Sequence, residues 1–132
     1  MSFAAELTAI ESRFKAAAII ADNLTFYGNV PAKPPDSEAS WVVVTVLNGD
    51  TERITIGTVE ERTAGVIIVQ CFGKQGIGDK TLRTLADSVA AAFRGANFSG
   101  ILCRSPSIRQ IPNSGSYRQL NVLIPFQRDE VH

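Results

Sequence analysis

The chain has 132 residues with 13 basic and 13 acidic side chains, so its formal net charge is zero, and 45% of its residues are hydrophobic. A chain of this length buries roughly two-thirds of its unfolded surface, so we expect one domain over residues 1–132 that folds without a disulfide or metal. Balanced charge argues against a protein that holds nucleic acid by its backbone, because such proteins carry a basic excess or stripe. Neither a membrane-length apolar run nor an export signal is visible, so we expect no membrane contact.

Apolar residues recur at helical spacing at the start of the chain: Phe3, Leu7, Ile10, Phe14 and Ala17. This spacing predicts an amphipathic helix that begins at Phe3 and ends near Asp22 and Asn23. The next stretch, "LTFYGNVPAKPPDSEAS", predicts a short extended segment and then an arm, because its prolines remove N–H donors and disfavour helix.

Two β-branched runs follow, and the dipeptide Asn48-Gly49 lies between them. The run "WVVVTVLNGD" stops at Asn48, Gly49 and Asp50, and "TERITIG" resumes with alternating apolar residues. Asn-Gly between two such runs predicts a hairpin turn. After a polar turn, "TVEERTAG", the run "GVIIVQCF" predicts a third strand inside the sheet, because both of its faces are apolar.

The stretch "FGKQGIGDKT" raises the question of a phosphate-binding loop. Gly73 and Gly78 have the separation of a Walker motif, but Asp79 follows them and Lys80 arrives one position late. The simpler interpretation is a connection from strand to helix in which Asp79 caps the helix. The helix itself is predicted by an apolar stripe and ends at Gly95; the stripe is Leu82, Leu85, Ala86, Val89 and Phe93.

Two further strands close the chain, near "GILCRSPSIRQI" and "YRQLNVLIPFQR", with "PNSGS" as the turn between them. In the last strand four apolar residues alternate with polar ones: Leu120, Val122, Ile124 and Phe126. The order of elements predicts an α+β fold with a mainly antiparallel β-sheet of about five strands and two α-helices packed on one face.

The sequence contains no pattern that indicates catalysis or metal binding. Cys71 and Cys103 each lie in an apolar run and are interpreted as buried thiols, with a disulfide as the alternative. The only histidine, His132, is the last residue, where it cannot be held against a nucleophile. Glu60 and Glu61 are adjacent and are interpreted as solvated loop charges. We therefore expect no enzyme, no metal and no cofactor.

The order and spacing of several segments resemble the small tail-terminator family of long-tailed bacteriophages and related prophages. The segments are "IESRF" in the first helix, "YGNVP" before the proline-rich arm, "WVVVTVLNGD", "GVIIVQCF", "LADSVAAAFRG" with "FSGILCRSPSI", and the closing "LNVLIPFQRDE". The similarity covers nearly the whole chain, although no single segment is a catalytic or diagnostic motif.

The resemblance implies a structural role. Members of this family form a ring, typically a hexamer, on the head-proximal end of the tail tube, where the ring stops polymerisation and offers a surface for joining the head. The implied partners are other copies of the chain, the tail tube protein and a head–tail connector protein. DNA would pass through the lumen without specific binding. The implied location is the virion tail, after assembly in the host bacterial cytoplasm.

A ring subunit presents two unlike patches to its neighbours, because heterologous contacts generate closed cycles. The candidate contact residues carry exposed charge or a large ring: Asp50, Glu52, Arg53, Glu60, Glu61, Arg62 and Trp41. The proline-rich arm and the C-terminal "FQRDEVH" are also candidate contact segments.

Three alternatives remain at this point. A head-completion or head–tail connector protein differs from a terminator only in the surface that it caps. A small-ligand-binding regulatory module would be a monomer or dimer with a pocket. A nucleotide-dependent enzyme is the least favoured alternative, because Asp79 occupies the position after Gly78 where a phosphate-binding loop has its lysine.

Overall fold

The computed structural model describes residues 3–20, 24–28, 40–53, 60–74, 79–114 and 117–131. Two helices and seven strands lie within these ranges. In chain order they are α1 (Phe3–Ala17), β1 (Thr25–Tyr27), β2 (Ser40–Arg53), β3 (Glu60–Lys74), α2 (Asp79–Phe93), β4 (Asn97–Phe98), β5 (Ile101–Cys103), β6 (Ser107–Ser114) and β7 (Tyr117–Val131).

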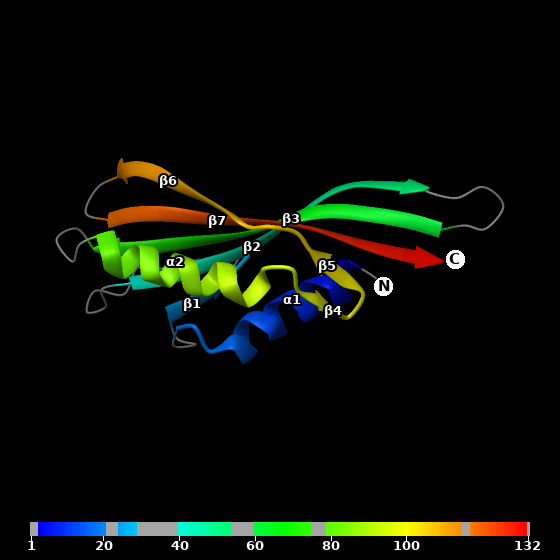
Figure 1. Ribbon diagram of the computed structural model, residues 1–132, viewed down its shortest axis with the longest axis horizontal. Helices are drawn as coiled ribbons and strands as arrows, with labels where there is room; N and C mark the ends of the chain where they lie inside the picture. The colour runs from blue at the N-terminus through cyan, green and yellow to red at the C-terminus, as the bar shows by residue number, and fades with distance from the viewer. Residues whose placement is uncertain are drawn as a thin grey trace.

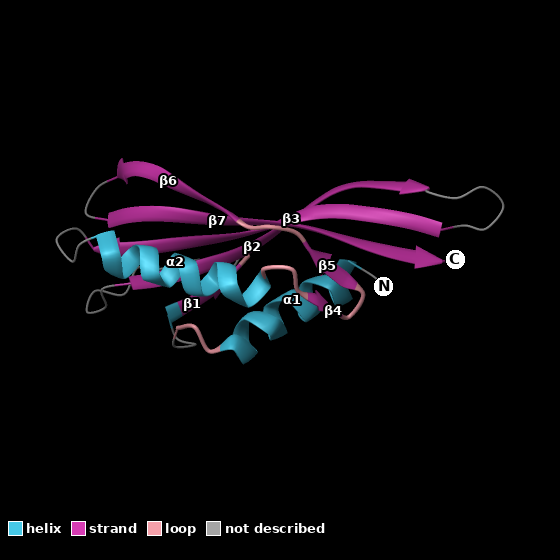
Figure 2. Ribbon diagram, in the orientation of Figure 1, coloured by secondary structure: helices cyan, strands magenta, loops and turns pink. Residues whose placement is uncertain are grey.

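The seven strands form one sheet with the order β1-β2-β3-β7-β5-β4 (Figure 1). Strand β6 pairs with the first half of β7, and β5 pairs with its second half, so both lie along the same edge of β7. Every strand pair is antiparallel except β1 with β2. The long strands β2, β3 and β7 dominate the sheet, and the two helices lie alongside it (Figure 2). The prediction of an α+β fold with a mainly antiparallel sheet is confirmed.

The core lies on one face of the three long strands. Cα register places Val44 beside Val69, and Val69 beside Val122, so these side chains point to the same face. They form one apolar cluster with buried residues of both helices, including Phe14 of α1 and Phe93 of α2. The alternation predicted for the last strand is confirmed, because its four apolar residues are all buried: Leu120, Val122, Ile124 and Phe126.

The predicted C-terminal end agrees with the structure for the second helix but not for the first. Helix α2 ends at Phe93, and Gly95 takes a left-handed φ of 62°, so the predicted stop at Gly95 is confirmed. Helix α1 ends at Ala17, earlier than the predicted end near Asp22, which lies outside the described residues. The chain leaves the helix at Ala18, whose φ is 49°, and this turn brings Ile19 and Ile20 against the core.

The predicted hairpin turn at Asn48-Gly49 is wrong. Strand β2 continues through both residues to Arg53, and its register with β3 shifts by a β-bulge between Asn48 and Thr51. Residues on both sides of the bulge pair with the same strand, and this pairing outweighs the local turn preference. A Cβ on Gly49 would lie 3.1 Å from the carbonyl oxygen of Ala64, so the glycine allows the close approach of the two strands.

The sheet has more strands than the five that the sequence predicts. The segment "GILCRSPSIRQI" is split into β5 and β6, because the register with β7 shifts between Cys103 and Ser107, although the Arg104 amide still donates to the Pro125 carbonyl oxygen at 2.8 Å. The short strands β1 and β4 were not counted as sheet strands in the prediction. The predicted polar turn "TVEERTAG" is also wrong in part, because residues 60–65 belong to β3. The central residues of the glycine-rich loop, 75–78, lie outside the described residues.

Candidate interaction surfaces

The three long strands extend past the first turn of α1 at one end of the molecule (Figure 1). We call this end the charged arm, defined as residues 50–53 of β2, 60–62 of β3 and 129–131 of β7. The arm contains six acidic and two basic positions: Asp50, Glu52, Glu60, Glu61, Asp129 and Glu130 against Arg53 and Arg62. The arm is therefore acidic, although the whole chain is neutral.

The structure brings together the charged residues that the sequence predicted as contacts. Glu52 of β2 lies opposite Arg62 of β3, and Arg53 lies opposite Glu61. Cross-strand neighbours of opposite charge stabilise an antiparallel pair modestly. Asp50 lies in the same part of β2, and Glu60 is the first residue of β3. The side chains of Asp50, Arg53 and Glu60 are outside the described set.

Strand β7 adds a third row of charge to the arm that sequence reasoning did not identify residue by residue. Arg62 donates from Nε and Nη2 to the two carboxylate oxygens of Asp129 at 2.9 and 3.1 Å. This hydrogen bonding, and the charge of Arg62, hold the pKa of Asp129 below its ordinary value. The C-terminal segment was predicted as a contact region. No local pattern could show that Asp129 lies beside Arg62, because these residues are 67 positions apart in the sequence.

The base of the arm contains a buried ion pair that the sequence gave no reason to expect. Glu6 of α1 is 0% exposed and Arg128 of β7 is 4% exposed. The Nε of Arg128 donates to Glu6 Oε1 at 2.7 Å, and the Asn48 side-chain amide donates to Glu6 Oε2. The guanidinium also lies 5.0 Å from the ring centroid of Phe3. Helix α1 is therefore attached to β2 and β7 at the point where the arm begins.

Trp41 lies near the opposite end of β2 from the arm. Its ring stacks on Phe72 of β3, with centroids 4.9 Å apart and planes 7° from parallel. The residue is 4% exposed, so its ring packs within the chain. Its use in contacts between subunits stays a prediction.

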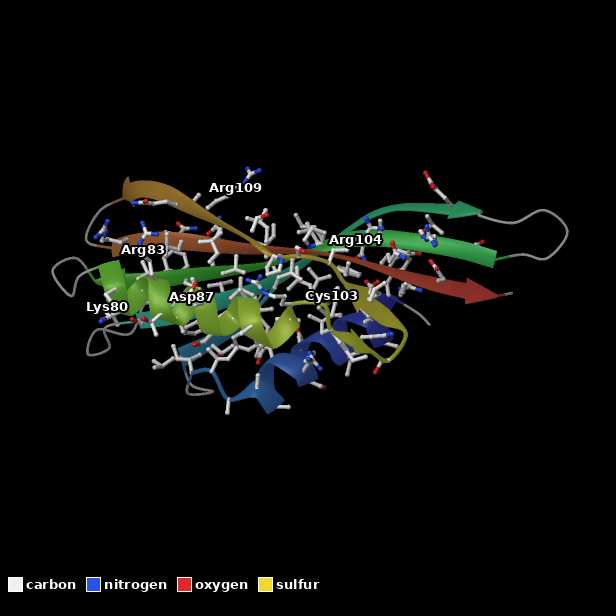
Figure 3. All side chains as sticks on the ribbon, in the orientation of Figure 1. Lys80, Arg83, Asp87, Cys103, Arg104 and Arg109 are labelled. Atoms are coloured by element: carbon white, nitrogen blue, oxygen red, sulfur yellow. The ribbon has the colours of Figure 1, made fainter. Side chains whose placement is uncertain are left out.

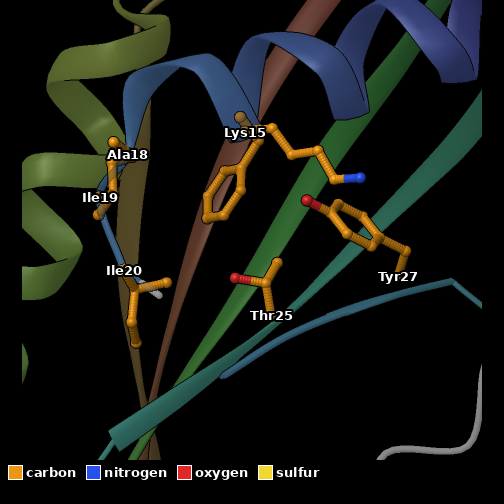
Figure 4. Close-up of a pocket in the computed structure, with 7 residues that line it drawn as sticks. Lys15, Ala18, Ile19, Ile20, Thr25 and Tyr27 are labelled. Carbon is orange, nitrogen blue, oxygen red and sulfur yellow. The ribbon is translucent and has the colours of Figure 1, made fainter. Parts of the chain in front are cut away.

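A cavity of about 520 Å³ lies between the end of α1 and β1 (Figure 4). Its lining is mainly apolar, with Phe14, Ile19 and Ile20 among the residues that form it. Lys15 lies at its edge, with Nζ 5.7 Å from the ring centroid of Tyr27. The described lining contains no carboxylate, imidazole or thiol, and its polar side chains are those of Lys15, Thr25 and Tyr27.

Both cysteines are buried free thiols, as the sequence predicted. Burial raises the pKa of Cys71 to about 12 and that of Cys103 to about 11, so the reactive thiolate is disfavoured. Among the described residues, no three His, Cys, Asp or Glu side chains gather as a metal site would require. Within the same residues, neither helix is long and apolar enough to cross a membrane.

Helix α2 begins at Asp79, directly after the glycine-rich loop. The start of the helix agrees with the predicted connection from strand to helix. The side chain of Asp79 lies outside the described set, so its capping role stays a prediction.

Comparisons with known proteins add information on the family. A family model described as phage tail terminator protein matches residues 7–126. One solved structure, of a protein that carries only a sequence identifier as its name, aligns with a TM-score of 0.68 at 19% identity. The alignment covers 100% of this chain and 96% of that one, and at this identity it shows the fold alone. A search of curated proteins gave no match.

Proposed function

Because the match spans most of the sequence, this chain belongs to the phage tail terminator family, and we propose that it caps the tail tube as a hexameric ring. Family membership gives the coarser role directly: the protein is a structural component of the phage tail. The proposed ring sits on the head-proximal end of the tube, stops its polymerisation and offers the surface on which the head is joined. The match over residues 7–126 is the observation that carries this proposal.

The proposed partners are other copies of this chain, the tail tube protein and a head–tail connector protein. DNA is proposed to pass through the lumen of the ring without specific binding. The zero net charge of the chain supports this, because proteins that bind DNA tightly neutralise many phosphates with basic side chains. Assembly is proposed to take place in the host bacterial cytoplasm before the tail joins the head.

The proposed contacts within the ring use the charged arm. Its charged side chains are held in register by three paired strands, and a defined pattern of charge favours recognition of a complementary surface. Trp41 is proposed to support contacts between subunits indirectly. Its ring stacks on that of Phe72, which is more exposed and is proposed to make the contact. A ring needs a second, unlike surface on each subunit to receive the first.

Tail length measured by negative-stain electron microscopy tests the proposed function. The gene is deleted from the virus or prophage that carries it, and tails are then imaged with and without the added protein. Overlong tubes without heads, which return to normal length when the protein is supplied, are the expected result. Tails of normal length that stay separate from heads would instead assign a head–tail connector role. Normal infectious particles would contradict both roles.

A further inference from the structure

The two ends of the sheet carry opposite charge. The end opposite the charged arm contains the end of β3, the start of α2, strand β6 and the start of β7, and we call it the basic edge (Figure 3). Its basic positions are Lys74, Lys80, Arg83, Arg109 and Arg118, against Asp79 and Asp87 on α2. A chain with zero net charge therefore has an acidic end and a basic end.

The separation of the two ends prevents them from neutralising each other within one molecule. Arg118 and Asp129 are eleven residues apart on the same strand, β7, which places them roughly 36 Å apart at about 3.3 Å per residue. The screening length is about 10 Å at 0.1 M salt. Each end therefore presents its own charge to an approaching molecule.

Three described cations of the basic edge lie on the surface: Lys80, Arg83 and Arg109. Arg83 and Arg109 are exposed, and Arg83 Nη2 lies 3.5 Å from Oε1 of Gln110, which is a neutral partner. These cations are spread over α2 and strand β6, which pairs with β7 along one side. On the acidic side, Glu52 is exposed and belongs to the arm's outer strand, β2. Among the described strands, β1 pairs with β2 only at Val42–Val44, which lie before the arm, and β6 pairs only with β7, so each surface includes an edge of the sheet.

We propose that the charged arm of one copy docks against the basic edge of a second copy of this chain. The inference rests on the proposed ring and assigns the two unlike surfaces that it requires. Because the two surfaces lie at different ends of each subunit, the contact is heterologous and repeats from copy to copy until the ring closes. An exposed apolar residue accompanies each surface: Leu47 of β2 is 50% exposed and Ile108 of β6 is 43% exposed. Leu47 precedes the arm on β2, and Ile108 points to the same face of β6 as Gln110, the partner of Arg83, and to the opposite face from Arg109.

Single charge reversals with matched controls test this docking. Glu52→Lys reverses a charge on the arm, and Glu11→Lys makes the same change on α1. Arg109→Glu reverses a charge on the basic edge, and Arg94→Glu makes the same change at the exposed residue that follows α2. Self-association of each purified protein is measured by analytical ultracentrifugation at low and high salt, and its fold is checked by circular dichroism.

The expected results follow from charge complementarity. Glu52→Lys and Arg109→Glu each weaken self-association at least about tenfold at low salt, and the two controls leave it within about threefold of wild type. Combining Glu52→Lys with Arg109→Glu restores association to within about threefold, because the reversed charges attract each other again. Association of the wild type falls as salt increases. If Glu52→Lys perturbs the fold, Glu52→Gln removes the charge without reversal and is expected to weaken association by a smaller factor.

Three results would overturn the docking. They are a wild type that stays monomeric, single reversals that associate like wild type, and a combined variant that fails to recover. Restored tail length in the electron microscopy test together with any of these would leave the terminator function in place and remove only this contact. An Arg109→Glu variant that self-associates normally but loses binding to double-stranded DNA would assign the basic edge to DNA instead.

Discussion

Replacing Glu6 by leucine should destabilise the protein far more than its position in the first turn of α1 suggests. Glu6 is 0% exposed and neutralises Arg128, which is itself 4% exposed. The Glu6→Leu variant introduces an apolar side chain of similar size and leaves the guanidinium of Arg128 buried without its carboxylate. Removing one partner of a buried pair costs about 3–5 kcal/mol. For a chain of 132 residues this lowers the melting temperature on the order of 10–20 °C.

The assay is urea unfolding followed by far-UV circular dichroism, with Glu11→Leu on the same helix as the control. The control is expected to change the free energy of unfolding by about 0.5 kcal/mol or less. A double variant, Glu6→Leu with Arg128→Met, should recover most of the lost stability, because a buried pair replaced by apolar groups of similar volume is often neutral. A cost for Glu6→Leu below about 1 kcal/mol, or a double variant no more stable than Glu6→Leu, would refute the buried-pair reasoning.

Three further outcomes follow from single residues. Gly65→Ala should destabilise the protein by about 1–3 kcal/mol in urea unfolding, because its Cβ would lie 2.7 Å from the Leu47 carbonyl oxygen; unchanged stability would contradict this. Asp129→Asn should cost at most about 1 kcal/mol at neutral pH, since Asp129 and Arg62 are both partly exposed. The pKa of Asp129 is lowered in the folded state, so its contribution is present above the unfolded pKa of about 3.9 and is lost as pH falls through the folded value. Urea midpoints measured across acidic pH should show this loss in wild type and not in Asp129→Asn. Cys71, 0% exposed and with a pKa of about 12, should react with a thiol reagent at neutral pH only as fast as the protein unfolds; rapid labelling of the native state would contradict its burial.

Sequence patterns predicted the faces of the elements better than their ends. The alternation that includes Val122 and Ile124 identified the buried face of the last strand, because a half-buried strand repeats every two residues. The apolar stripe that ends at Phe93 identified the buried side of the second helix, because one face of a helix repeats every 3.6 residues. The error at Asn48-Gly49 came from a strong local turn signal that pairing on both flanks overrides.

The contacts of the arm could not be predicted, because they depend on sheet register. Arg62 and Asp129 are 67 positions apart, and Glu6 and Arg128 are 122 positions apart. A shift of one residue between β3 and β7 would turn Asp129 to the other face of the sheet and break its pair with Arg62. The sequence could therefore indicate that residues 50–53 and 60–62 are rich in charged side chains, but not that β7 completes the arm.

The position of the buried pair explains why the arm is suited to tests by charge reversal. The apolar cluster contains Phe126 of β7, and the next inward-facing residue along the strand is Arg128, whose charge is met by Glu6. Beyond this point the arm is held by backbone pairing and cross-strand contacts, such as the 3.1 Å contact between the hydroxyls of Thr51 and Thr63. Glu52→Lys places a second cation opposite Arg62, which costs no more than about 1 kcal/mol, while the backbone pairing of β2 with β3 along the rest of both strands does not depend on this charge. Loss of association in Glu52→Lys with an unchanged far-UV spectrum therefore reports on docking rather than on folding.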